Sequence, residues 1–147
     1  MLIRNMALSD IGAVVEIEKN CFSQPWSEKS FEDSIQRDDT IFLVCQEEAN
    51  VMGYIGMYVS FDEASITNVA VSPLHRKKGC GEALILEAKK AAKERAVETI
   101  FLEVRVSNEP AISLYKKTNF QNLGIRKKFY EHPVEDAYIM SCALTDS

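Results

Sequence analysis

The sequence predicts a mixed α/β fold with a mostly antiparallel sheet. Three successive segments, residues 40–47, 51–61 and 64–71, are rich in β-branched and aromatic residues and are separated by short turns. That pattern is typical of an antiparallel meander. Residues 81–96 then carry apolar side chains at helical spacing among charged ones, and residues 99–106 return to a strand pattern. A helix placed between strands late in the chain favours an α/β sheet over an all-β fold.

The residues before the meander predict one short strand and two helices. Residues 2–4 form an apolar start that fits a strand. Ser9 is a candidate N-cap for the first helix, and Ser27 is a candidate N-cap for the second. Trp26 and Phe31 flank the second cap at the spacing of a hydrophobic staple.

The residues after 106 predict a helix and two closing strands. Asn108 is a good N-cap for the helix that follows, and Asn119 can end that helix in the left-handed conformation. Residues 122–130 and 136–144 read as strands. The predicted order is strand, two helices, three strands, helix, strand, helix and two strands, which gives seven strands and about four helices. We expect one domain spanning residues 1–147.

Composition narrows the classes of partner. The chain has 147 residues, a net charge of −5 and a pI of about 5.1, which argues against nucleic acid as the main partner. No apolar run is long enough for a membrane span, and the N-terminus has no extended apolar segment of a secretory signal. A cytoplasmic protein with no membrane partner is therefore expected. The sequence leaves the oligomeric state open.

The cysteines predict reduced thiols and no metal site. None of them forms a C-x-x-C pair, and neither histidine stands at zinc-ligand spacing from them. Three of the four lie in apolar surroundings and are expected in the core. The residues considered are Cys21, Cys45, Cys80, Cys142, His75 and His132.

The segment from Arg76 to Gly81, RKKGCG, predicts an anion site. It follows a strand and opens a helix, where unpaired N–H groups and the helix dipole attract phosphate. Its glycines permit close approach of a ligand, and its basic side chains add charge-assisted contacts. A glycine turn carrying solvated lysines is the alternative interpretation. The segment matches neither the Walker P-loop nor the G-x-G-x-x-G dinucleotide fingerprint.

In this element order, the R-x-x-G-x-G pattern resembles the GCN5-related N-acetyltransferases over essentially the whole chain. The resemblance implies a sheet splayed between its fourth and fifth strands, with acetyl-coenzyme A in the gap. It also implies that main-chain groups of residues 69–71 bind the pantetheine arm and that residues 76–82 bind the phosphates. The cofactor-binding residues it implies are Val69, Ala70, Val71, Arg76, Lys77, Lys78, Gly79, Cys80, Gly81, Glu82 and Asn108.

Three longer segments narrow the resemblance. FLEVRVSNEPAISLYKKTNF, FSQPWSEKSF and FYEHPVEDAYIM are similar to the bacterial subgroup that acetylates the N-terminal alanine of a ribosomal protein. The resemblance implies a protein N-terminus, in particular that of a small-subunit ribosomal protein, as the acceptor. Asn119 departs from the glycine that the family usually has there, but asparagine tolerates the left-handed conformation. Cys80 within the lysine-rich turn is a second departure.

Acetyl transfer to an amine needs a proton acceptor for the ammonium and a proton donor for the leaving thiolate. The resemblance assigns these roles to Glu103 and Tyr115. From the residues alone, Glu103 could equally be a solvated charge beside Arg105, and Tyr115 a packing residue with a satisfied hydroxyl. Trp26 and Tyr130 are candidates for lining the peptide site, although either could be a core aromatic.

Two further hypotheses accompany this interpretation. Cys80 stands at a helix N-terminus beside lysines, a setting that lowers a thiol pKa, so its oxidation could block cofactor binding. The acceptor could also be a small-molecule amine or a lysine side chain, since fold does not settle the acceptor. A non-catalytic sensor of acyl-coenzyme A is the alternative of another class.

Overall fold

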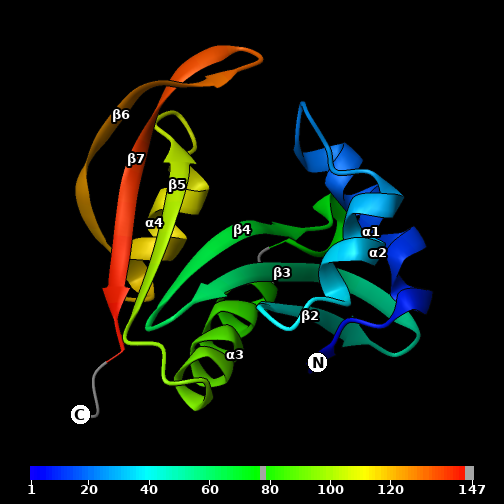
Figure 1. The fold of residues 1–147 in the computed structure, drawn as a ribbon. Coiled ribbons are helices and arrows are strands. Elements are labelled where there is room, and N and C mark those ends of the chain that lie inside the picture. Colours follow the sequence, from blue (N-terminus) through cyan, green and yellow to red (C-terminus); the bar gives the residue numbers. More distant parts are fainter. Residues whose placement is uncertain (77–78, 145–147) are drawn as a thin grey trace.

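The computed structural model describes residues 1–76 and 79–144 and contains one seven-stranded sheet in the order β1-β2-β3-β4-β5-β7-β6. Helices α1 and α2 cover one face of the sheet, and α3 and α4 cover the other (Figure 1). All neighbouring strands are antiparallel except β4 and β5, which are parallel. The strands are β1 (Leu2–Asn5), β2 (Thr40–Glu47), β3 (Asn50–Ser60), β4 (Glu63–Val71), β5 (Thr99–Arg105), β6 (Gln121–Glu131) and β7 (Val134–Ala143). The helices are α1 (Ile11–Cys21), α2 (Glu28–Ile35), α3 (Cys80–Glu94) and α4 (Glu109–Lys117), with short 3-10 turns η1 (Leu8–Asp10) and η2 (Pro73–His75).

The predicted fold class and order of elements are confirmed, and most of the predicted helix caps are present. The Ser27 hydroxyl accepts a hydrogen bond from the backbone N–H of Ser30 at 3.1 Å, which caps α2. The Trp26 and Phe31 rings lie 5.2 Å apart as the predicted staple. The Asn108 side chain caps α4 through the N–H of Ala111, and Asn119 ends it with a φ of 73°.

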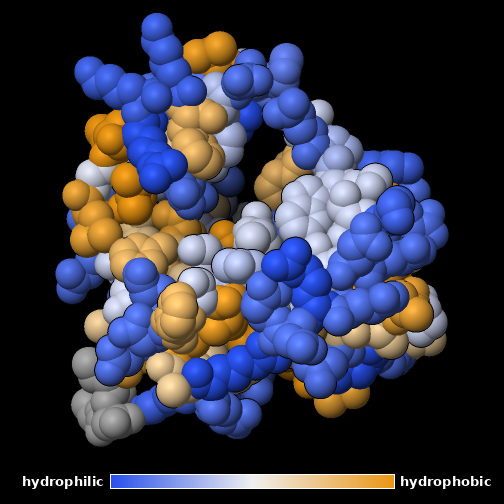
Figure 2. Space-filling view, viewed as in Figure 1, coloured by the Kyte–Doolittle hydropathy of each residue, from blue (hydrophilic) through white to orange (hydrophobic). Residues whose placement is uncertain are grey.

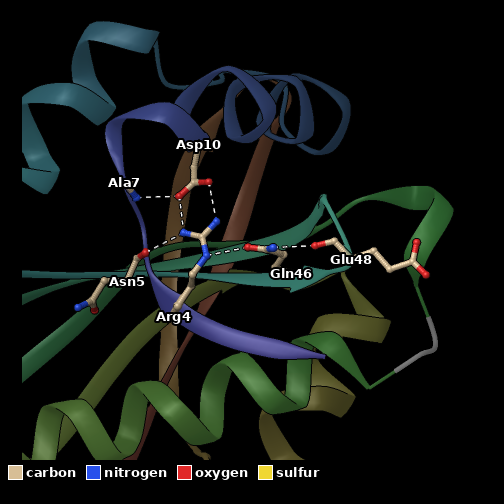
Figure 3. A network of polar contacts seen from close by, with 6 residues as sticks. All are labelled: Arg4, Asn5, Ala7, Asp10, Gln46 and Glu48. Carbon is tan, nitrogen blue, oxygen red and sulfur yellow. Dashed lines mark hydrogen bonds and ion pairs between the residues drawn. The ribbon is translucent and has the colours of Figure 1, made fainter.

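The predicted cap at Ser9 is wrong, because Asp10 fastens the start of the first helix instead. The Asp10 carboxylate accepts the N–H of Ala7 at 2.7 Å and two hydrogen bonds from the Arg4 guanidinium at 2.7 and 2.8 Å. Arg4 also donates to the side chain of Gln46 on β2 at 2.7 Å (Figure 3). The network joins η1 to two strands, which a local serine cap would not do. The Arg4 hydrogen bonds lower the pKa of Asp10.

Two hydrophobic cores hold the layers together. The larger one lies between the sheet and α3 and α4, and it contains Ile85, Leu102 and Met140. The smaller one lies under α1 and α2, where Phe31 packs edge-on against Phe42 and Tyr54. Among residues 1–76 and 79–144, no helix combines the length and apolar character needed to cross a bilayer.

The sheet opens at β4 and β5. These strands pair only at one end, where Glu63, Ala64 and Ser65 align with Thr99, Ile100 and Phe101. Beyond Ser65 the two strands diverge, as Figure 1 shows, so residues 66–71 of β4 have no ladder partner on β5. The predicted splay between the fourth and fifth strands is confirmed, and it leaves a strand edge facing a gap.

Candidate active site

A cleft of about 420 Å³ occupies the gap between β4 and β5. Its walls come from α1 and the segment after it, from β4 and β5, from α4, and from the β6–β7 turn. Figure 2 shows the surface hollowed between the β6–β7 end and the α1–α2 helices. The lining includes four residues named from the sequence, Glu103, Tyr115, Asn108 and Val69, and both candidate acceptor contacts, Trp26 and Tyr130.

Glu103 lies on the cleft side of β5, on the face covered by α1 and α2. Its neighbours Leu102 and Val104 are buried in the core of the opposite face, and strand alternation therefore turns Glu103 toward the first face. Arg105 is on the same face but pairs with Glu135 at 3.1 Å and not with Glu103. No described residue donates a hydrogen bond to the Glu103 carboxylate, which leaves it available in the cleft.

Tyr115 approaches the cleft from α4, on the other face of the sheet. Its ring is 6% exposed and packs against Phe120 at 5.7 Å. Its hydroxyl has no hydrogen-bond partner among the described residues. In that part of the chain, the side-chain atoms that are both buried and unpartnered are Asn68 Nδ2 and His75 Nδ1, so the Tyr115 hydroxyl is not buried. The hydroxyl therefore opens to the cleft. Burial raises the pKa of Tyr115, with a smaller contribution from Tyr130, so the phenol keeps its proton at neutral pH.

The segment predicted to bind phosphates begins α3. Gly79 has a φ of 82°, in the left-handed region, and the helix starts at Cys80. A Cβ added to Gly79 would meet no atom within 4 Å, so this start of the helix is open to a ligand. Glu82 pairs with Lys117 on α4 at 2.8 Å, which makes it a structural contact between two helices. Lys77 and Lys78 lie outside the described residues.

Arg76 folds back over the end of β4. Its guanidinium donates to the carbonyl of Val71 at 3.3 Å and lies 3.3 Å from the Cys21 sulfur. Ala70 and Val71 pair with β3 on one side, and their other side faces the gap. The main chain predicted to bind a pantetheine arm therefore stands at an open strand edge.

The expectation that its place at a helix N-terminus lowers the pKa of the Cys80 thiol is wrong, and its burial argues against the hypothesis of oxidation. Its side chain is 2% exposed, and its sulfur lies 3.0 Å from where a Cβ of Gly53 would be. Burial raises the pKa of Cys80, and its contact with Cys45 raises it further. The helix dipole that favours a thiolate is outweighed by desolvation, because the side chain points into the core and not into the phosphate turn. All four cysteines are free, and Cys45, Cys80 and Cys142 are buried, which confirms the prediction that three of the four lie in the core.

The candidate acceptor residues sit at the mouth of the cleft. Tyr130 packs under Arg105, whose guanidinium carbon lies 4.2 Å from the ring centroid. Burial raises the pKa of Tyr130, the Arg105 charge opposes that shift, and Glu103 adds to it. Trp26 packs against Phe42 at 6.2 Å, so its ring is part of the small core as well as of the cleft wall.

Two polar residues that the sequence analysis missed shape this mouth. Glu18 is 2% exposed and accepts hydrogen bonds from the N–H of Trp26, at 2.9 Å, and from the Tyr54 hydroxyl. A glutamate on the apolar face of the first helix pattern was the available signal. Arg105 donates to the carbonyls of His132 and Pro133 at 3.2 and 3.0 Å, and Ser23 donates to the same His132 carbonyl. The segment after α1 and the β6–β7 turn therefore meet across the cleft.

The features of the cleft indicate a group-transfer enzyme. A parallel strand pair that separates, an open helix N-terminus beside it, and a carboxylate and a phenol in the gap suit an enzyme that transfers a group between two substrates. No group of three or more His, Cys, Asp or Glu side chains in residues 1–76 and 79–144 is placed to hold a metal ion.

Comparison with known proteins gives the family. The acetyltransferase (GNAT) family model matches residues 11–120, so the chain belongs to that family. A Bacillus subtilis (strain 168) protein named "Putative [ribosomal protein bS18]-alanine N-acetyltransferase" is 42% identical, over 94% of this chain and 92% of its own. The N-alpha-acetyltransferase of Sulfurisphaera tokodaii is 30% identical, and the match covers 97% of this chain and 92% of the relative. The crystal structure of the Escherichia coli ribosomal-protein-S18-alanine N-acetyltransferase superposes with a TM-score of 0.89 at 31% identity. The match covers 99% of this chain and 95% of that one.

Proposed function

We propose that this N-acetyltransferase moves the acetyl group of acetyl-coenzyme A to the N-terminal α-amine of a protein. The observation that carries the chemistry is the placement of Glu103 and Tyr115 at the gap, on opposite faces of the sheet. An amine that enters from the α1–α2 face meets the carboxylate, and a thioester that enters from the α3–α4 face meets the phenol.

Glu103 acts as the general base. The α-ammonium of a peptide has a pKa of about 7.7–8.0 and must lose a proton before its nitrogen can attack. The Glu103 carboxylate takes that proton directly or through one water. The nitrogen then forms a bond to the acetyl carbon while the carbon–sulfur bond breaks, and it loses a second proton to solvent. Since the sulfur gains one proton, one proton is released overall. Attack is direct, since no acyl-enzyme is needed.

Tyr115 acts as the general acid. The leaving sulfur carries the electron pair of the broken bond and needs a proton. The Tyr115 hydroxyl is open to the cleft, and its raised pKa keeps that proton available at neutral pH. The thiol leaves, and the phenol regains its proton from solvent.

The open strand and the start of α3 fit acetyl-coenzyme A. Main-chain groups of Val69, Ala70 and Val71 would hold the pantetheine arm, and the turn from Arg76 to Glu82 would hold the phosphates. The space around Gly79 and the fifteen-residue length of α3 support this, because the helix N-terminus favours anions. Asn108 has its side chain engaged as a cap and lines the cleft, so both of its suggested roles are compatible. Bound acetyl-coenzyme A supplies an activated thioester.

The relatives support a ribosomal protein as the acceptor. The 42% identical relative is named for the N-terminal alanine of bS18, and the similarity covers nearly all of both chains. We propose bS18 as the substrate of this protein too. The net charge of −5 suits a basic ribosomal acceptor.

The test is acetyl transfer to short peptides that differ in their first residue, beside a set of small amines. Modification of the α-amine of alanine-starting peptides is expected to exceed that of the small amines. The Glu103→Gln variant should lose turnover by about 100-fold or more while its affinity for coenzyme A is retained. Transfer to small amines alone would refute the proposed acceptor. Unchanged turnover in Glu103→Gln would remove Glu103 as the base.

A further inference from the structure

Asn68, on β4, carries a buried donor that has no hydrogen-bond partner among residues 1–76 and 79–144. The residue is 6% exposed and lines the cleft. Its Oδ1 accepts a hydrogen bond from the Thr67 hydroxyl at 2.8 Å, but its Nδ2 has no partner among the described residues. An unsatisfied buried donor is costly, so such an atom in a cleft indicates a ligand that completes it.

A β-bulge gives Asn68 this position. Gly56 on β3 pairs with Asn68 and Met57 pairs with Ile66, which leaves Thr67 as the extra residue. The bulge changes which side chains face each way. Ile66 packs in the core under α3, whereas Ala70 packs in the core under α1 and α2. Asn68 stands two residues before Ala70 and therefore faces α1 and α2.

The Thr67 hydroxyl contacts the Oδ1 end of the Asn68 amide. Its hydroxyl lies 3.2 Å from the Gly56 carbonyl and 2.8 Å from Asn68 Oδ1. Because Oδ1 is held by this neighbour, Nδ2 is the atom that remains for a ligand. In this orientation the cleft wall presents an N–H donor.

Glu103 lies on the same face of the sheet, across the gap on β5. Glu18 from α1 and Trp26 line the same cleft. In the proposed function this is the acceptor side, since Tyr115 belongs to the opposite face. The ligand that meets Asn68 is therefore the acceptor.

The chemistry of the donor restricts the acceptor. An amide N–H cannot bind an ammonium group and needs a lone pair, and the carbonyl oxygen is the strongest neutral acceptor that a peptide offers. In a peptide N-terminus, the carbonyl carbon is two bonds from the amine nitrogen. Polyamines carry no carbonyl, and in a lysine side chain the nearest one is several bonds further away.

We propose that Asn68 Nδ2 donates a hydrogen bond to the carbonyl oxygen of the acceptor's first residue, which makes the site selective for amines that adjoin a carbonyl. This inference rests on the proposed function and deepens it. The contact places the amine next to Glu103 while the rest of the chain leaves through the mouth of the cleft.

The experiment is a cycle of two acceptors and two enzymes. One acceptor is an alanine-starting peptide, and the other is the same peptide with an alkene isostere at its first peptide bond, which keeps the shape but lacks the carbonyl oxygen. In Asn68→Ala, kcat/KM for the normal peptide is expected to fall about 10- to 100-fold, and that for the isostere less than about threefold. Intrinsic differences in amine reactivity cancel in the ratio. Asn50→Ala, at an exposed position at the start of β3, is the matched control and should leave both values unchanged.

The readouts separate a contact from a structural effect. The KM for acetyl-coenzyme A should stay within error in Asn68→Ala. Equal losses on both acceptors would overturn the inference. Asn68→Asp keeps the size but removes the donor and should lose as much as Asn68→Ala, so wild-type kcat/KM in that variant would show that the free atom is an acceptor. If the wild type acetylates no peptide N-terminus, both the proposed function and this inference are refuted. If the wild type is active and Asn68→Ala loses equally on both acceptors, only the inference is refuted.

Discussion

Replacing Tyr115 by phenylalanine removes one hydroxyl and nothing else from the cleft. The ring is buried against Phe120, and that packing is retained by phenylalanine. The hydroxyl has no hydrogen-bond partner among the described residues, so its loss leaves no group unsatisfied and the unfolding midpoint should not fall. The general-acid contribution should disappear. That contribution is typically 10²- to 10⁴-fold, so kcat should drop by a factor in this range, equivalent to about 3–5 kcal/mol of transition-state stabilisation.

The assay is initial-rate acetylation of an alanine-starting peptide from pH 6 to 10, for wild type and Tyr115→Phe. In the wild type, kcat/KM should rise as the peptide ammonium loses its proton near pH 8. Because burial raises the pKa of Tyr115, the acid stays protonated and no decline from its ionisation should appear below about pH 10. A kcat of Tyr115→Phe within twofold of wild type would refute the assignment. A decline that begins below pH 9 and vanishes in the variant would refute the raised pKa.

Three further predictions concern stability and the thiols. Asp10→Asn should lower the free energy of unfolding by about 1–2 kcal/mol at pH 7, since two hydrogen bonds from Arg4 lose a charged acceptor. Because the pKa of Asp10 is lowered in the folded state, this stabilisation is complete above the ordinary pKa of 3.8 and is lost as the pH falls through the folded-state pKa. The urea midpoints of wild type and variant should therefore converge in acid, and a constant difference between them would contradict this. Gly56→Ala should destabilise by about 1–3 kcal/mol, because the new Cβ would collide with the Phe42 ring, whereas Gly12→Ala on α1 meets no atom within 4 Å and serves as the control that should not destabilise. A thiol reagent should label the half-buried Cys21 in the native protein and all four cysteines only after unfolding; rapid native labelling of Cys80 would show that it is not buried.

Local signals predicted the architecture well because they depend on neighbouring residues. Ser27 and Asn108 cap helices as their side chains and positions predict, and the staple of Trp26 and Phe31 forms. Ser9 and Asp10 are both acceptable caps by type. Asp10 is the residue that precedes α1, and its carboxylate binds the N–H of Ala7 and the guanidinium of Arg4 on β1, a contact that is not visible in the local pattern.

The chemistry of the cleft was harder to predict where it depends on pairing between strands. Alternation along β4 is broken at Thr67 by the bulge, and the bulge follows from the register with β3. Sequence alternation alone therefore could not show that Asn68 faces the same way as Glu103. The predicted low thiol pKa of Cys80 was wrong for a related reason. Its position at a helix N-terminus suggested a thiolate, but its packing over Gly53 buries the side chain. Glu103 and Tyr115 were found through family resemblance, and the structure places both in the cleft.

The most direct measurement of the central claim is the position of the acetyl group on one peptide that carries an N-terminal alanine and an internal lysine. The peptide is incubated with the enzyme and acetyl-coenzyme A, and the product is mapped by tandem mass spectrometry. Acetylation of the alanine α-amine and an unmodified lysine are expected. Acetylation of the lysine alone, or no product from an enzyme that binds coenzyme A, would contradict it.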